Sequence, residues 1–419
     1  MKKVFVIALL VIGLGLTAFA ADKVTVQLWM GLNDPIREAL EYFREQNPDI
    51  NLVVEDVPAG MMREKVLLAL AAGTPPDVLH DYTGRTFAWA NQGFLEPLED
   101  TLTEQDYEDY VPGLIELNTI GGHFVGYPRG MTYRVWDVNK TLCERAGVAD
   151  LLPTEPGRNW TLEAYMKVAT AIRDLGVYPF GFFAKGPSGD YFMLTHFQVF
   201  GASLYENGDY TKITLNSEAG VRALQWMIDM VGQGYAPKGV AGICDDDFVA
   251  MKNRGQIAIG GWGGLLKQRQ LNFENGIIDY VPDLYPVSLP HIEGVPGPPA
   301  FVAWNSVVVF KGQSPERLAA SKRLARFIGS KKFFEFGITP RAIPAWKSYP
   351  NEYLDDTGKF QLEWISVNGV GDLGYASPFY LQVRDLQSEA LQAAFMGLKT
   401  PKEALDDFAE AIAKLWEDD

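Results

Sequence analysis

The stretch that decides the fold begins Val24-Thr25-Val26-Gln27-Leu28-Trp29, whose β-branched and aromatic residues predict a buried strand. Asn33-Asp34-Pro35 follows as a helix cap with proline in the first turn, and Asn47-Pro48 ends the helix. The segments after it continue the alternation, with a strand expected at 50–54, a helix at 61–72 and extended chain at 77–80. Strands alternating with helices in this way indicate a βαβ-type α/β sheet.

The same alternation returns in the rest of the chain. Four further helices are predicted to begin at these places: at Thr161 as a cap, at Asn216-Ser217-Glu218, at Ser314-Pro315-Glu316, and at a capping box that Thr400 opens. Strands are expected at 257–260 and 301–310. A chain of 419 residues is comfortable for two domains, so we expect two α/β domains.

Composition excludes several function classes. The formal net charge is −16, whereas nucleic-acid binding needs a basic face that neutralises phosphates. The chain shows no repeats or stalk-like composition, which disfavours a structural or adhesive role. We therefore expect an acidic globular protein that binds no nucleic acid.

The first residues predict export. Lys2 and Lys3 precede an apolar run over 4–16, and Ala18 and Ala20 supply the small residues of a cleavage site. The run is shorter than the roughly 20 residues that span a bilayer. We expect a signal peptide over 1–20, cleavage after Ala20, and a mature protein in the periplasm.

The number and spacing of cysteines and histidines do not favour a metal site or a disulfide framework. Cys143 and Cys244 are the two cysteines, too few and too far apart for a disulfide framework, and two buried free thiols are expected. The four histidines stand singly, without metal-ligand spacing. No metal site and no cofactor are predicted.

Several segments then carry a resemblance to a known family. The segments are Phe43-Arg44-Glu45-Gln46-Asn47-Pro48-Asp49-Ile50, Leu68-Ala69-Leu70-Ala71-Ala72-Gly73-Thr74-Pro75-Pro76-Asp77-Val78, Gly93-Phe94-Leu95-Glu96-Pro97-Leu98, Val138-Asn139-Lys140 to Ala146-Gly147, Trp160-Thr161, Thr214 to Glu218 with Gly232 to Tyr235, and Gly260-Gly261-Trp262. In this order they resemble family 1 extracellular solute-binding proteins of ABC transporters, which include the maltose-binding proteins.

The resemblance implies a two-lobed periplasmic-binding-protein fold with three hinge crossings and a ligand cleft between the lobes. The transferred boundaries are residues 21–131 plus 305–350 for lobe I and 132–304 plus 351–419 for lobe II. It also implies a monomer that binds a sugar or oligosaccharide and delivers it to ABC permease subunits in the membrane.

Sugar recognition favours particular residue types in such a cleft. Aromatic rings stack on the apolar faces of a sugar, while Asp, Asn and Arg hydrogen-bond its hydroxyls. The ligand-binding residues we predict on these grounds and by the resemblance are Trp262, Tyr380, Tyr191, Asp81, Arg85, Asn33, Asp34, Tyr133 and Trp304. Trp262 ranks first because glycines surround it, so that its ring lacks a local neighbour. Some of these residues also suit a role other than ligand binding. Asn33 and Asp34 suit a helix cap, Asp81 and Arg85 suit a solvated loop, and Trp262 suits the core of a lobe.

Other functions stay open at this point. An exported glycosidase would need two carboxylates that meet only in the folded chain, so the sequence leaves that alternative standing. No G-x-S-x-G elbow, H-E-x-x-H motif or P-loop occurs, and no catalytic residue is assigned. A non-sugar polyol or a glycerol-phosphate-type solute is a further alternative ligand.

Overall fold

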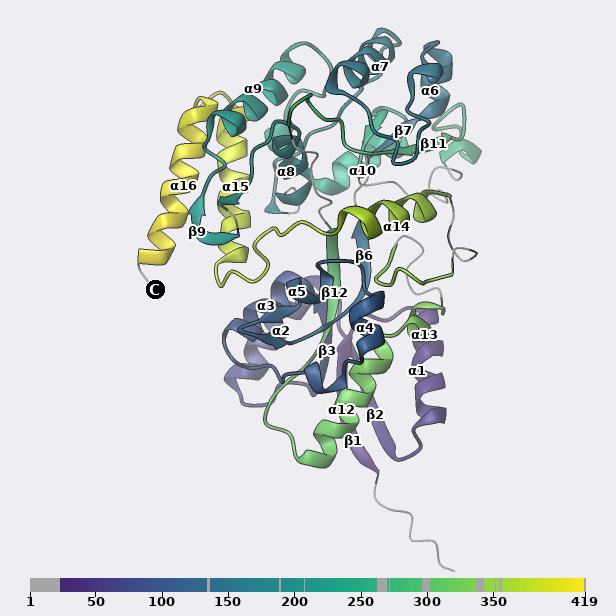
Figure 1. Ribbon diagram of the computed structural model, residues 1–419, viewed down its shortest axis with the longest axis vertical. Coiled ribbons are helices and arrows are strands. Elements are labelled where there is room, and N and C mark those ends of the chain that lie inside the picture. Colours follow the sequence, from purple (N-terminus) through teal and green to yellow (C-terminus); the bar gives the residue numbers. More distant parts are fainter. Residues whose placement is uncertain are drawn as a thin grey trace, which may run out of the picture.

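The computed structural model describes residues 23–133, 136–187, 190–206, 208–261, 270, 272–295, 302–336, 343–350, 352, 354 and 356–417. The predicted signal peptide and Trp262 lie outside these residues. Two groups of elements are visible in Figure 1, each around its own sheet, with α14 between them. The chain therefore has a two-lobed α/β fold.

The larger sheet has six strands in the order β13-β6-β12-β3-β1-β2. Its strands are β1 (Val24–Met30), β2 (Ile50–Asp56), β3 (Val78–Tyr82), β6 (Tyr127–Tyr133), β12 (Val302–Val309) and β13 (Ile343–Pro344). β1 pairs in parallel with β2 and with β3, which confirms the predicted βαβ arrangement. β12 enters from late in the chain and runs antiparallel between β3 and β6.

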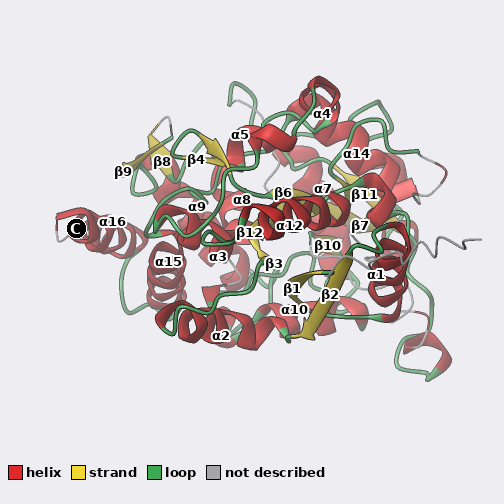
Figure 2. Cartoon of the chain, turned by 90° about the horizontal axis from the view of Figure 1, so that it is seen from below, coloured by secondary structure: helices red, strands yellow, loops and turns green. Residues whose placement is uncertain are grey.

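The helices that belong to this larger-sheet lobe enclose the sheet, as Figure 2 shows from below. They are α1 (Asp34–Gln46), α2 (Ala59–Ala71), α3 (Thr83–Asn91), α4 (Glu104–Asp109), α5 (Leu114–Leu117), α12 (Pro315–Ile328) and α13 (Lys331–Phe334). α12 packs on β1, β3, β6 and β12, while α3 packs on β3 and β12. A small hairpin of β4 (Thr119–Ile120) and β5 (His123–Phe124) completes the lobe.

The smaller-sheet lobe is built around β10-β7-β11. Its strands are β7 (Trp136–Asn139), β10 (Ile259–Gly260) and β11 (Leu284–Val287), with a separate hairpin of β8 (Tyr205–Glu206) and β9 (Asp209–Ile213). Its helices are α6 (Lys140–Arg145), α7 (Leu162–Asp174), α8 (Asp190–Val199), α9 (Glu218–Gly232), α10 (Asp245–Asn253), α15 (Tyr380–Phe395) and α16 (Pro401–Glu417). α14 (Asp356–Asn368) contacts both β11 and β13, so it touches strands of both sheets.

The four predicted helix starts are confirmed. The side-chain oxygens of Thr161, Ser217 and Ser314 accept hydrogen bonds from the backbone N–H three residues ahead, at the first turns of α7, α9 and α12. Thr400 and Glu403 bond each other's backbone N–H groups as a capping box before α16. The strand expected at 257–260 is shorter than predicted, because only Ile259 and Gly260 pair with β7.

The two cysteines differ in their surroundings. Cys143 is buried on α6, and burial raises the pKa of its thiol to about 12. Cys244 is also a free thiol but only half-buried, which corrects the expectation that both are buried. It precedes α10, where its thiol donates to Asp247 Oδ2 at 3.1 Å. A position at a helix end explains the exposure.

The core of the smaller-sheet lobe contains a neutral histidine. His196 on α8 is 3% exposed and packs against Trp136, Phe182 and Phe192, with ring centroids 4.8 to 5.2 Å away. Burial lowers the pKa of His196 to about 4. The folded state therefore resists protonation, whereas the same ring in the unfolded chain takes up a proton near pH 6.5.

This difference predicts a loss of stability in mild acid. Between pH 8 and pH 5, His196 binds a proton in the unfolded state but stays neutral in the folded state. This difference lowers the free energy of unfolding by about 2 kcal/mol. His196→Phe should remove that share of the pH dependence in urea unfolding at the two pH values. The exposed His123 provides a control, since His123→Asn should leave the dependence in place. An unchanged pH dependence in His196→Phe would contradict this assignment.

Candidate binding site

The carboxyl end of β3 meets the first turn of α15, and three of the described candidate residues, Asp81, Arg85 and Tyr380, lie there. β3 ends at Tyr82, α3 begins at Thr83, and α15 begins at Tyr380. α3 and α15 are in contact, which brings a helix of the larger-sheet lobe against one of the smaller-sheet lobe. The carboxyl ends of strands are where α/β sheets commonly place ligands.

Two tyrosine hydroxyls join the helices at this contact. Tyr82 Oη and Tyr380 Oη lie 2.6 Å apart. Tyr380 is 2% exposed, and its ring packs on Tyr375 with centroids 4.9 Å apart. Arg384, one helical turn further along α15, lies 5.3 Å from the Tyr82 ring and 5.5 Å from the Tyr380 ring. The result is an aromatic cluster with a cation over both rings.

Glycine permits this close approach. A Cβ atom added to Gly84 would lie 2.2 Å from Cε1 of Tyr380 and 2.8 Å from Cε1 of Tyr82. Real Cβ contacts are not that short, so any other residue at this position would displace the tyrosine rings. Gly84 therefore sets the distance between α3 and α15.

Asp81 and Arg85 form a fork beside the tyrosines. Arg85 Nε donates to Asp81 Oδ2 at 2.6 Å, and Nη2 donates to the other carboxylate oxygen. Asp81 is 5% exposed, while Arg85 keeps about a fifth of its side chain accessible. Such a bidentate pair fixes the guanidinium plane and leaves its remaining N–H groups for hydroxyl oxygens.

The other predicted residues fall into three groups. Trp304 is 2% exposed, and its indole Nε1 donates to Asn118 Oδ1 at 3.2 Å, so it packs in the core beneath the tyrosine cluster. Asn33 caps α1 by accepting from the Ile36 N–H at 2.9 Å, and Asp34 is the first helical residue. Tyr133 ends β6 and Tyr191 lies on α8, while Trp262 is outside the described residues.

Sequence reasoning missed Tyr82, Gly84 and Arg384. A tyrosine that directly follows Asp81 at the end of a buried strand was a usable signal for Tyr82. Arg384 follows Tyr380 by four residues, the spacing that places two side chains on one helix face. The role of Gly84 depends on a helix about 300 residues away in the chain, which local sequence does not reveal.

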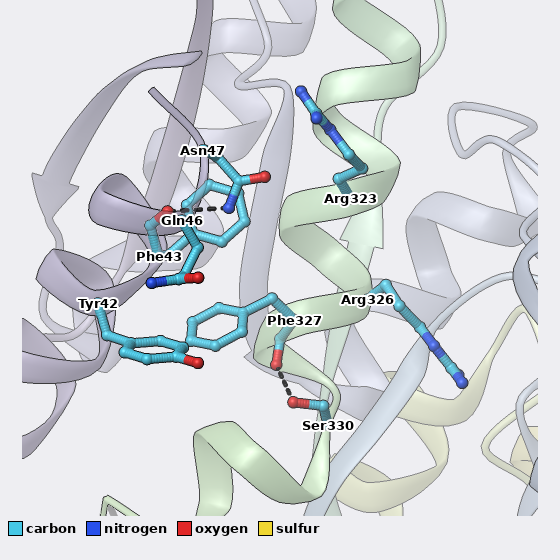
Figure 3. Close-up of a pocket in the computed structure, with 8 residues that line it drawn as sticks. All are labelled: Tyr42, Phe43, Gln46, Asn47, Arg323, Arg326, Phe327 and Ser330. Carbon is cyan, nitrogen blue, oxygen red and sulfur yellow. Dashed lines mark hydrogen bonds between the residues drawn. The ribbon is translucent and has the colours of Figure 1, made fainter. Parts of the chain in front are cut away.

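A separate hollow lies between α1 and α12 (Figure 3). Its volume is about 330 Å³, and Tyr42 and Phe327 stack across it with centroids 6.0 Å apart. Arg323 and Arg326 on its rim are engaged with Asp49 and Asp106. None of the predicted ligand residues lines this hollow. Within the described residues, no group of three or more His, Cys, Asp or Glu side chains is arranged to hold a metal ion.

The chain has relatives among known proteins. The model of the family described as bacterial extracellular solute-binding protein matches residues 31–343. A binding protein of Brucella abortus is 24% identical over 259 residues, which cover 60% of this chain and 61% of that protein. The arabinooligosaccharide-binding protein of Bacillus subtilis is 23% identical over 394 residues, covering 88% of this chain and 86% of the relative.

Solved structures share the fold. The cyclic α-maltosyl-1,6-maltose binding protein of Arthrobacter globiformis aligns with a TM-score of 0.77 at 16% identity, covering 95% of this chain and all of that one. At this identity the similarity supports the two-lobed architecture alone. Among the described residues, no helix combines the length and the apolar character needed to cross a membrane.

The close contact at Gly84 predicts that a larger side chain there lowers stability and moves the two lobes apart. Gly84→Ala should push α3 away from Tyr380, costing about 1 to 3 kcal/mol of stability, and should increase the radius of gyration measured by X-ray scattering. Gly60→Ala on α2 is the matched control, since a Cβ atom at Gly60 would have no atom within 4 Å. It should leave the radius unchanged. If Gly84→Ala behaves like Gly60→Ala, the contact does not hold the lobes together.

Proposed function

Because this chain belongs to the bacterial extracellular solute-binding protein family, we propose that it binds a sugar or oligosaccharide between its lobes and delivers it to an ABC importer. The observation that carries the proposal is the cluster of Tyr82, Tyr380, Arg85 and Arg384 where α3 meets α15. Rings and forked donors from both lobes at one place suit the alternating apolar faces and hydroxyls of a sugar.

The names of relatives support a carbohydrate ligand. One relative binds arabinooligosaccharides, and a structural neighbour from Thermotoga lettingae was solved with α-D-tagatose. We infer that Trp262, Tyr191 and Tyr133 complete the site from the smaller-sheet lobe and the first crossing. Asn33 has a capping role already, and Trp304 supports the site from the core. A non-sugar polyol or a glycerol-phosphate-type solute is the alternative ligand.

The proposed mode of action is hinge closure. A solute that touches both lobes has higher affinity for the closed form and shifts the population toward it. The permease subunits then recognise the closed outline of the exported protein. Lobe I would comprise 21–131 plus 305–350, lobe II would comprise 132–304 plus 351–419, and the signal peptide would be removed after Ala20. The protein would act as a periplasmic monomer.

Binding without turnover fits the chemistry of the described carboxylates at this site. Both carboxylate oxygens of Asp81 already accept hydrogen bonds from the Arg85 fork. The glycosidase alternative requires a second carboxylate across the scissile bond. Incubation with the bound oligosaccharide should therefore return it unhydrolysed.

Trp262 provides the sharpest test of the proposed site. Arabino- and malto-oligosaccharides should raise the melting temperature of the protein, because a ligand that binds only the folded state stabilises it. With a sugar identified in this way, Trp262→Ala should weaken binding by about 2 kcal/mol or more in calorimetric titration if the ring stacks on the sugar. Trp262→Tyr should retain part of the affinity. Full affinity in a folded Trp262→Ala variant would remove this residue from the site.

A further inference from the structure

Arg129 on β6 stands out because it is buried and has no hydrogen-bond or ion-pair partner among the residues that the structure describes. The residue is 7% exposed, and its Nη1 is enclosed without a hydrogen bond. Within the part of the chain that the structure describes, no ion pair or hydrogen bond reaches its guanidinium, and its Cζ lies 5.7 Å from the centre of the Phe333 ring. Burial lowers the pKa of Arg129 to about 10, so it stays charged at neutral pH.

Buried charges elsewhere in the described residues are compensated. The buried carboxylates Asp77, Asp81 and Asp137 hold Arg317, Arg85 and Lys252 respectively. Lys252, the other long cation that is buried, also donates to the Gly260 carbonyl at 2.6 Å. Leaving one buried charge unpaired costs several kcal/mol. Among the buried charged side chains that the structure describes, Arg129 is therefore the exception that has no ion-pair partner.

A bulge in the sheet lies at this residue. Trp304 pairs with Met131 and Ser306 pairs with Pro128, so Arg129 and Gly130 together face Asn305 alone. Bulges re-aim a side chain and are frequent next to functional sites. Through Asn305 the bulge is level with Tyr82, the last residue of β3. Arg129 thus lies two strands away from Tyr82, level with the residue where β3 ends.

His80 on β3 adds a second unsatisfied group. It is 7% exposed, and its Nε2 is buried without a hydrogen bond. Burial first and the charge of Arg129 second lower the pKa of His80 well below its usual value, so the ring is neutral. A neutral ring can donate one N–H to an anion without adding another buried charge. Arg129 and His80 together provide hydrogen-bond donors for which the described residues supply no acceptor.

We propose that Arg129, assisted by His80, receives the carboxylate of an acidic sugar, so that the solute carried by this protein is an oligosaccharide containing a uronic acid. This inference rests on the proposed function. A carboxylate matches the planar fork of one arginine in a bidentate pair, whereas a phosphate dianion calls for more positive charge. The resulting pair would neutralise the buried charge only when the solute is bound.

The test begins with the unliganded protein. Arg129→Met should raise the melting temperature by roughly 2 °C, because an apolar chain of similar length replaces an uncompensated buried cation. Arg326→Met is the matched control, since Arg326 pairs with Asp106 at 2.7 Å and should lower the melting temperature when removed. If Arg129→Met is destabilised as Arg326→Met is, Arg129 is a structural residue and the proposal is overturned.

The second arm uses acidic and neutral oligosaccharide pools from hydrolysed glucuronoarabinoxylan, separated by anion exchange and read by native mass spectrometry. Wild type should bind uronate-containing species from the acidic pool, and Arg129→Met should bind them at least tenfold more weakly. Unchanged binding by Arg129→Met overturns the proposal. Binding of the neutral pool alone overturns it while leaving the proposed function intact, and binding of neither pool counts against both.

Discussion

The central position of β12 is the constraint on which the structure depends. This strand lies between β3 and β6 and pairs with both, although it follows β6 only after the whole smaller sheet has been built. The larger sheet therefore cannot close until residues 302–309 have returned from the other lobe. Because the chain must leave and re-enter this sheet, the two lobes are tied together where the chain crosses between them.

The same strand positions the candidate site. A buried network fixes the base of α3: Thr83 Oγ1 donates to the Trp304 carbonyl at 2.7 Å, and Asn118 Oδ1 accepts from Trp304 Nε1 and Ser306 Oγ. These bonds hold Trp304 beneath Tyr375, and Tyr375 in turn packs on Tyr380. Packing thus runs from the central strand to the surface where the lobes meet. The bulge at Arg129 lies where β12 pairs with β6, so it involves the same central strand.

Local chemistry explains what the sequence predicted well. Caps such as Thr161 and Ser314, and the alternation from Val24 to His80, depend on residues within a few positions of one another, so their structural consequences are readable. The placement of β12 and the approach of Gly84 to Tyr380 depend on residues hundreds of positions apart. Asp81 and Arg85 were expected at the site, but their fork was not, since pairing depends on rotamers. Chain length and local patterns predicted two α/β domains, and the order of the family segments added which two-lobed fold they form.

The central claim is that a solute bound between the lobes, beside the contact of α3 with α15, shifts the protein toward its closed form. X-ray scattering with and without a saturating oligosaccharide tests it most directly, because closure changes the overall dimensions of the protein. The account predicts a smaller radius of gyration in the bound state. An unchanged radius at saturation, with binding verified by calorimetry, would contradict it.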